Sequence, residues 1–281
     1  MELTQIQPTL KPAPLEGTDN RYKVLRAYLD NHGLDGLPGN PYDMKDYRIW
    51  LEAQGYAQTT IINHISVLRE LYRHVGIETS RILKSPSVPS GFLKDALGDS
   101  EAIRLLDFSD KTCSLRDRLI IHLMLNLGLR ECEIKRIDVG DFYQQDQRYW
   151  LRIWGKKASG KDQKMEVCNG LLDIMLDYRN QYLKGMPSDH PFILSRKGGR
   201  ICHGSLSRIV SGIMQAAGVK TDENSHRITP HSLRHTAVTK VLQISGNIRI
   251  AQKFARHKDV RTTERYAHDT SEIRPEHYAT W

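Results

Sequence analysis

Apolar residues recur at intervals of three and four positions along most of this 281-residue chain, which is the spacing of an amphipathic helix. In the N-terminal part this pattern predicts helices over 21–31, 43–53 and 59–75. Glycines and prolines separate the first two segments, and a glycine follows each of the last two. We therefore expect a small all-helical module of about four short helices, with lysines and arginines on its surface.

A second region with helical spacing follows a stretch rich in serine and proline. A short helix is expected from Ser100, and a well-buried helix from Leu115 to Gly128. Further helices are expected over 171–183, 204–217, 231–244 and 247–256.

The period changes from helical to alternating near residue 149. Tyr149, Leu151 and Ile153 alternate with bulky or charged neighbours, which indicates a strand. A turn rich in glycine and lysine follows over 155–162, and 163–168 returns as a second strand. The predicted fold class is therefore mainly α with a small antiparallel β-sheet.

These patterns divide the chain into a loose arm, two domains and a linker. We place the arm at 1–18, a helical domain at 19–77 and the linker at 78–94. The larger domain covers 95–281 and ends in a tail over 267–281.

The composition is that of a soluble globular protein with an excess of positive charge. There are 41 Lys and Arg against 33 Asp and Glu, a formal net charge of +8, which favours polyanionic partners. No stretch approaches the roughly 20 apolar residues of a membrane span, and the N-terminus lacks the features of a secretion signal. We expect a cytoplasmic protein that does not bind membranes.

The cysteines exclude the common metal and redox motifs. Cys113, Cys132, Cys168 and Cys202 lie far apart and form no C-x-x-C pair. We expect reduced, mostly buried thiols, with no metal and no cofactor.

The residues with the clearest chemistry lie near the C-terminus. Tyr266 follows His257 by nine positions, and His231 and Arg234 stand one turn apart at the start of a predicted helix. A tyrosine that attacks a phosphodiester must lose its phenolic proton, and negative charge builds up on the phosphate oxygens. Arginines suit this task, because the guanidinium fork binds phosphate oxygens and stays charged.

Four motifs follow one another along the chain: Gly128-Leu-Arg-Glu-x-Glu-Ile, a Gly155-Lys hairpin, His231-Ser-Leu-Arg-His-Thr, and His257-x-x-x-x-Thr-Thr-x-x-Tyr. In kind and order they resemble the motifs of the tyrosine recombinases, also called the phage integrase family. The chain resembles this family over nearly its whole length, specifically in the C-terminal half and only architecturally in the N-terminal half. The resemblance implies a SAM-like core-binding domain at 19–77 and a catalytic domain at 95–281.

The resemblance also implies a role for each matching residue. Arg130 and Arg234 clamp the scissile phosphate, and His231 accepts or relays the proton of the nucleophile. His257 hydrogen-bonds a phosphate oxygen. Tyr266 attacks, which gives a 3′-phosphotyrosyl enzyme and a free 5′-hydroxyl.

Other positions match less closely. The hairpin lysine that protonates the leaving oxygen maps best to Lys156, with Lys157 and Lys161 as alternatives. Glu133 matches a supporting acidic position. The family usually has glycine where this chain has Arg256, a residue without the freedom of glycine at positive φ.

The partners that the resemblance implies are DNA and further recombinase subunits. The DNA is a double-stranded recombination site held between the two domains, with Arg200 and Arg208 as candidate contacts. Recombination needs four protomers on two sites, as a homo-tetramer or as a hetero-tetramer with a paralogue. In the tail, Ile273, Tyr278 and Trp281 are candidate contacts with a neighbouring subunit.

We therefore expect a metal-independent site-specific recombinase of a compact Xer-like or mobile-element type, acting in integration, excision or resolution. One alternative is a DNA-binding accessory protein of the same fold with weak or no catalysis. A second is an enzyme similar to type IB topoisomerases. A metallonuclease is disfavoured because the sequence has no acidic cluster of the ligand type.

Overall fold

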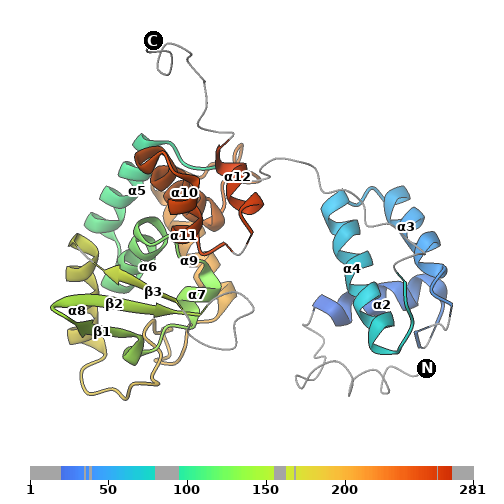
Figure 1. Cartoon of the computed structure of the whole chain (residues 1–281), viewed down its shortest axis with the longest axis horizontal. Helices are drawn as coiled ribbons and strands as arrows, with labels where there is room; N and C mark the ends of the chain where they lie inside the picture. The colour runs from blue at the N-terminus through green and yellow to red at the C-terminus, as the bar shows by residue number, and fades with distance from the viewer. Residues whose placement is uncertain are drawn as a thin grey trace, which may run out of the picture. The chain divides into compact units, whose positions relative to one another are not determined.

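The structure is a computed structural model that describes residues 20–34, 36–37, 40–79, 95–154, 163–167, 169–257 and 259–267. The chain divides into two compact units, Met1–Ser90 and Gly91–Trp281 (Figure 1). Each unit has its own hydrophobic core. Within the described ranges, no helix has the length and apolar character needed to cross a membrane.

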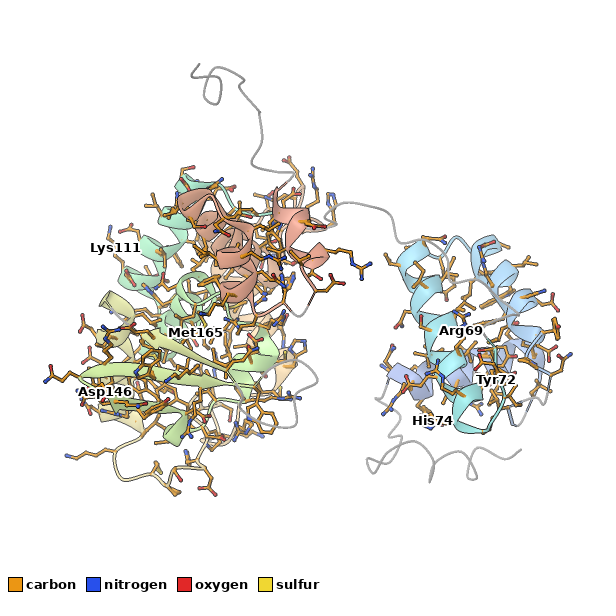
Figure 2. All side chains as sticks on the ribbon, viewed as in Figure 1. Arg69, Tyr72, His74, Lys111, Asp146 and Met165 are labelled. Carbon is orange, nitrogen blue, oxygen red and sulfur yellow. The ribbon has the colours of Figure 1, made fainter. Side chains whose placement is uncertain are left out.

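The described part of the smaller unit is helical, as the apolar spacing predicts. Its helices are α2 (Asn20–His32), α3 (Asp43–Ala53) and α4 (Gln58–His74). Tyrosines contribute to the core between them. The hydroxyls of Tyr28 and Tyr72 lie 3.1 Å apart, and Tyr72 extends from α4 (Figure 2). Each buried hydroxyl thus has a hydrogen-bonding partner, as buried tyrosines generally require.

The larger unit contains a three-stranded antiparallel sheet in the order β1–β2–β3. Its strands are β1 (Phe142–Gln145), β2 (Arg148–Ile153) and β3 (Gln163–Val167). The last two are the predicted strands, whereas β1 was not predicted, because only its first residue is buried and it shows no alternation. Asp146 and Gln147 form the turn between β1 and β2 with positive φ angles, a conformation that matches the twist of a hairpin (Figure 2).

The remaining elements of this unit are helical, and two of the helices are central to the packing. They are α5 (Asp99–Thr112), α6 (Leu115–Asn126), α7 (Glu131–Lys135), η2 (Val139–Asp141), α8 (Asn169–Tyr182), α9 (His203–Ala216), α10 (Pro230–Ser245), α11 (Ile248–Ala255) and α12 (Arg261–Ala267). Helix α6 packs against α5, α8, α9 and α10, and its residues 119–124 are all buried, as expected for an internal helix. Helix α5 is longer than the short helix expected from Ser100.

Helix α10 is the second internal helix, and it carries polar side chains into the interior. Its residues 232–239 are all buried, including Arg234 and His235. Pro230 occupies the first helical position after the N-cap Thr229, where its missing N–H is not needed. A buried charge such as Arg234 requires hydrogen-bonding partners, and these partners define the candidate site.

The expectation of mostly buried cysteines is wrong for the three that the structure describes. Cys113 is half-buried, and Cys132 and Cys202 are exposed; all three are free thiols. Cys202 is the N-cap residue of α9, and Cys132 lies in α7, where Glu133 and Ile134 take the buried positions.

Candidate active site

Arg130 is positioned by a sharp turn between α6 and α7. Gly128 adopts φ +57, and a Cβ at this position would lie 3.0 Å from a ring carbon of Phe254, so only glycine fits without adjustment. Arg130 then caps α7, and its backbone N–H donates to Oε2 of Glu133 at 2.8 Å. Its guanidinium also bonds the other oxygen of Glu133, while 19% of the Arg130 side chain stays exposed.

Arg234 joins this turn to the end of α11. Its guanidinium donates to the carbonyls of Gly128 and Ala255 and to Nε2 of His257, the last at 3.3 Å. The side chain is only 1% exposed. Burial, reinforced by Arg130 and Arg256, lowers the pKa of the Arg234 guanidinium. One side chain from α10 thus fixes the relative positions of the segments that carry Arg130 and His257.

The contacts of His257 determine where its ring proton lies. A guanidinium can only donate, so Nε2 accepts from Arg234, and Nδ1 carries the proton that is donated to Oγ1 of Thr263 at 2.9 Å. Burial, together with Arg234, Arg130, Arg256 and His231, lowers the pKa of His257 to about 3. The ring is therefore neutral at physiological pH.

Tyr266 packs inside the unit in this structure. Its ring centroid lies 4.7 Å from that of His235 and 5.9 Å from that of His257. The residue is 3% exposed and belongs to a core cluster of α10, α11 and α12 that includes Val238 and Ala251. The phenol also acts electrostatically on Arg234, so the two groups share one site.

His231 is exposed on the first turn of α10, whereas Arg234 is buried. An electrostatic interaction with His231 contributes to the low pKa of His257, which places His231 at the same site. The structure therefore brings together residues of α10, α12, the segment after α11 and the turn before α7, namely Arg130, His231, Arg234, His257 and Tyr266.

Lys156, Lys157 and Lys161 lie outside the described residues, and so do the tail residues Ile273, Tyr278 and Trp281.

Glu133 is the acidic centre of this group. Its side chain is 3% exposed and lies within 4 Å of three guanidinium groups, those of Arg130, Arg256 and Arg234. Burial alone would raise the pKa of Glu133, but the three arginines and the Arg130 backbone N–H outweigh it and lower the pKa. The carboxylate stays ionised and holds the arginines in place.

Two residues of the site were not assigned a role from sequence. Thr263, which is fully buried, orients His257. Arg256 adopts φ 57 and ψ 39 after α11, the left-handed conformation that glycine favours, and its guanidinium reaches Glu133 at 3.0 Å. The one sequence signal for Arg256 was that the family usually has glycine at this position. Glu133, which Arg256 contacts, lies 123 positions away in the sequence.

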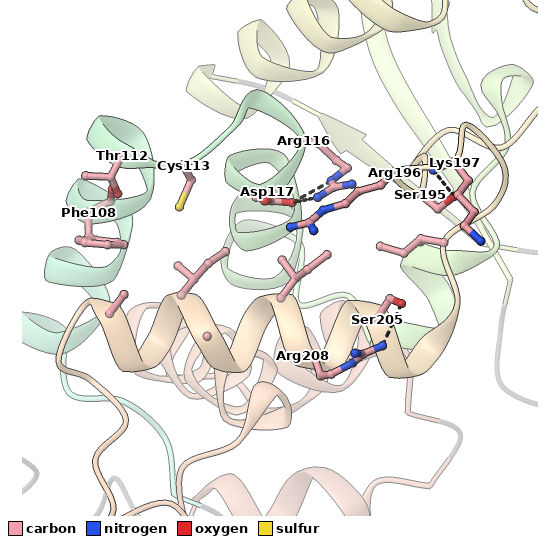
Figure 3. Close-up of a pocket in the computed structure, with 15 residues that line it drawn as sticks. Phe108, Thr112, Cys113, Arg116, Asp117, Ser195, Arg196, Lys197, Ser205 and Arg208 are labelled. Carbon is pink, nitrogen blue, oxygen red and sulfur yellow. Dashed lines mark hydrogen bonds and ion pairs between the residues drawn. The ribbon is translucent and has the colours of Figure 1, made fainter.

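The described residues contain a cavity of about 700 Å³ elsewhere in the unit, between α5, α6, α9 and the 195–201 segment (Figure 3). Arg116, Arg196, Lys197 and Arg208 contribute positive charge to its lining, and none of the site residues above lines it. In the described ranges, no three His, Cys, Asp or Glu residues gather in a way that could hold a metal ion.

Comparisons with known proteins place these features in context. The sequence model of the phage integrase family matches residues 96–272. Tyrosine recombinase XerC of Actinobacillus succinogenes is 32% identical over 172 residues, which are 60% of this chain and 55% of that relative. Tyrosine recombinase XerA of Pyrococcus furiosus is 27% identical over 263 residues, 92% of this chain and 86% of the relative. The chain thus spans about half the length of the first relative and most of the second.

Among solved structures, the XerH site-specific recombinase bound to a palindromic difH substrate, a post-cleavage complex, has the same fold. The TM-score is 0.69 at 18% identity, and the match covers 93% of this chain and 78% of that one.

Proposed function

This chain belongs to the phage integrase family, and on that basis we propose that it is a site-specific DNA recombinase that cuts and rejoins DNA through Tyr266. The observation that supports this most is the contact of one buried guanidinium, that of Arg234, with His257, against whose ring Tyr266 packs. A phenol, a neutral imidazole and paired arginines are the groups that phosphodiester transfer to a tyrosine requires.

Arg130 and Arg234 are the proposed phosphate clamp. Both lie beside the Glu133 carboxylate. This carboxylate bonds Arg130 directly, and the carbonyls of Gly128 and Ala255 hold the Arg234 guanidinium before any substrate arrives. Arg130 is the more accessible of the two, and Arg234 approaches the site from the interior. Donors that are already oriented stabilise the charge of the pentavalent transition state without reorganising.

The proposed reaction exchanges one ester bond for another. The Tyr266 oxygen forms a bond to phosphorus while the bond from phosphorus to the 5′-oxygen breaks, which leaves a 3′-phosphotyrosyl enzyme. The phenolic proton passes to His231. The 5′-oxygen takes a proton from the hairpin lysine, for which Lys156 is the proposed residue, with Lys157 and Lys161 as alternatives. Attack by a 5′-hydroxyl of another strand reverses these steps and rejoins the DNA.

His257 must change its protonation to fulfil its proposed role. Its Nε2 accepts from Arg234 in the free protein, whereas a phosphate oxygen needs a donor. Burial and the cations around the ring lower its pKa, and the negative charge of a bound phosphodiester offsets the effect of the cations. DNA binding thus raises the pKa of His257 and favours a second ring proton.

The proposed nucleophile must also become accessible. At 3% exposure Tyr266 cannot reach a DNA phosphate from its present position between two imidazole rings. Helix α12 spans only seven residues and is the element that has to shift. DNA or a neighbouring subunit would supply the free energy for this step.

We propose that both units contact DNA, mostly through phosphates. In the larger unit, Arg208 on α9 is a better candidate than Arg200. The guanidinium of Arg200 is already bound to Asp138 and to the carbonyls of Lys135 and Ile137, whereas Arg208 bonds only atoms of its own helix among its described contacts.

The proposed assembly is a tetramer on two DNA sites, formed by this chain alone or with a paralogue. The proposed task is integration, excision or resolution of a DNA element.

The test is covalent capture on DNA. Purified protein is incubated with a randomised library of centrally nicked duplexes, in EDTA, and denaturation-resistant complexes are sequenced. A recombinase enriches a short inverted repeat in the captured DNA. Relaxation of supercoiled plasmid without sequence enrichment would favour a topoisomerase, and binding without capture would favour an accessory protein.

A further inference from the structure

Arg256 occupies a backbone conformation that disfavours every residue except glycine. It ends α11 at φ 57 and ψ 39, where an L-residue places its Cβ close to the backbone. Asp146 and Gln147 are the other described non-glycine residues with positive φ, and both lie in a hairpin turn where the strand twist demands it. An arginine in this conformation therefore needs compensation from its side chain.

The Arg256 side chain provides that compensation through several contacts. It is 4% exposed and donates to Oε2 of Glu133 at 3.0 Å. It also donates to the carbonyl of Leu127 at 3.2 Å and to that of Gly128 at 3.0 Å. Arg256 thus connects the end of α11 to α7 and to the turn that carries Arg130.

The contact of Arg256 with Glu133 also affects the electrostatic environment of Arg234. Oε2 of Glu133 lies 3.0 Å from Arg256 but 3.9 Å from Arg234, so Arg256 is the closer guanidinium at that oxygen. Arg256 thus offsets the pull of the carboxylate on Arg234, whose guanidinium bonds Gly128, Ala255 and His257.

The net charge of the cluster around Glu133 also supports a role for Arg256 in cleavage. One carboxylate faces three guanidinium groups, so the cluster of Glu133, Arg130, Arg234 and Arg256 carries two positive charges. Removal of Arg256 leaves one. Phosphodiester transfer increases the negative charge on the phosphate oxygens, and the second positive charge favours that transition state over the ground state.

We propose that Arg256 is a positioning residue for DNA cleavage, which holds the Glu133 carboxylate and the Arg130 turn so that Arg130 and Arg234 face the scissile phosphate. The inference rests on the recombinase function proposed above. It assigns to this chain a guanidinium in place of the glycine that the family usually has, and it gives that guanidinium a function beyond ending a helix.

Arg256 both ends α11 and holds the Glu133 carboxylate, and substitution by glycine separates these two roles. Arg256→Gly relieves the backbone and removes the guanidinium, whereas Arg256→Lys keeps a charge but loses the fork. Arg249→Gln is the matched control, because Arg249 is an exposed arginine of the same helix whose guanidinium bonds Gln252. Glu133→Gln removes the shared carboxylate.

The first readout is the rate of covalent complex formation at saturating protein, on the nicked duplex that the wild type selects from the library. We expect Arg256→Gly to slow covalent complex formation about tenfold or more, while its DNA affinity stays within about twofold of the wild type. Arg256→Lys should restore part of the rate. Arg249→Gln should leave the rate unchanged. Wild-type rates for Arg256→Gly would overturn the proposal.

The second readout needs no DNA. The ¹³C carboxyl signal of Glu133, identified by its loss in Glu133→Gln, is titrated in the free protein. Arg130, Arg234 and Arg256 are the charged groups that face this carboxylate, and all three lower its pKa. Without Arg256 the titration midpoint should rise, and the cleavage rate should begin to fall at a higher pH than in the wild type.

The two readouts distinguish the possible failures. If the wild type forms no covalent complex, the proposed function fails, while the titration still tests the pairing of Arg256 with Glu133. If the wild type cleaves and the midpoint does not move in either Arg256 variant, the positioning role is wrong.

Discussion

Arg234 donates a hydrogen bond to Nε2 of His257 at 3.3 Å, and this contact fixes the neutral tautomer of the histidine. The proton then lies on Nδ1 and is held by Thr263. Because the ring is buried and surrounded by cations, it resists further protonation until a negative charge enters the site. The free protein therefore holds His257 neutral, with both ring nitrogens hydrogen-bonded.

This arrangement predicts an acid-sensitive contribution to stability. The pKa of His257 is about 3 in the folded state and about 6.5 in the unfolded chain. Between these values the unfolded state binds the extra proton, so the free energy of unfolding falls as the pH falls, by at most about 1.4 kcal/mol per pH unit. His257→Gln should lack this component. Urea unfolding of both proteins between pH 6.5 and 5 measures it, and parallel slopes would contradict the assignment.

Arg234 should not be replaceable by lysine. An ammonium group cannot reach the carbonyls of Gly128 and Ala255 and the ring of His257 together. We expect Arg234→Lys to lower covalent complex formation by about 10²–10³-fold and the free energy of unfolding by about 1–3 kcal/mol. Arg227→Lys, at an exposed pair with Asp95, serves as the control and should change neither. If Arg234→Lys forms the covalent complex as fast as the wild type, the forked guanidinium of Arg234 is not essential for cleavage.

Gly128 should be more sensitive than other glycines with the same backbone angles. Gly128→Ala is strained at φ +57 and also places its Cβ 3.0 Å from Phe254. Gly246→Ala is strained at φ +59 but meets nothing within 4 Å. Gly246→Ala should cost about 1–2 kcal/mol of stability, and Gly128→Ala should cost more because of the added contact. Only Gly128→Ala should also slow cleavage, because it displaces Arg130. Equal cleavage by the two variants would argue against the turn as a determinant of the site.

Much of the fold follows from local pattern, because helices with an apolar stripe and strands with alternation have characteristic periods. The strands β2 and β3 and the helices around Arg234 and His257 were predicted in this way. Strand β1 is too short for a period to develop. Its position is set by packing, which a local pattern does not encode.

Site residues were predictable where they belong to a distinctive sequence motif. They were not predictable where their role depends on a contact with a residue far away in the sequence. The motifs around Arg130, Arg234, His257 and Tyr266 indicated the members of the cluster. The left-handed backbone of Arg256 depends on Glu133, which lies far away in sequence. The burial of Tyr266 against His235 likewise depends on how α12 packs on α10.

That burial predicts low chemical reactivity of Tyr266 in the free protein. Tyr266 is 3% exposed, whereas Tyr42 is 55% and Tyr182 is 42% exposed. Nitration with tetranitromethane should therefore modify Tyr42 and Tyr182 well before Tyr266, as followed by peptide mass spectrometry. His235→Ala removes the ring against which Tyr266 packs and should raise its reactivity. If Tyr266 reacts as fast as Tyr42 in the wild type, the phenol is not buried in solution.

The most direct test of the account is to locate the DNA adduct on the protein. The covalent complex is trapped on the selected nicked duplex in EDTA, digested with nuclease and trypsin, and the peptide that begins at Tyr266 is fragmented. The same peptide contains Tyr278, so fragment masses must separate the two, and Tyr266→Phe is examined in parallel. We expect a 3′-phosphonucleotide on Tyr266, with no adduct but undiminished DNA binding in Tyr266→Phe. An adduct on any other residue, or one that persists in Tyr266→Phe, would contradict it.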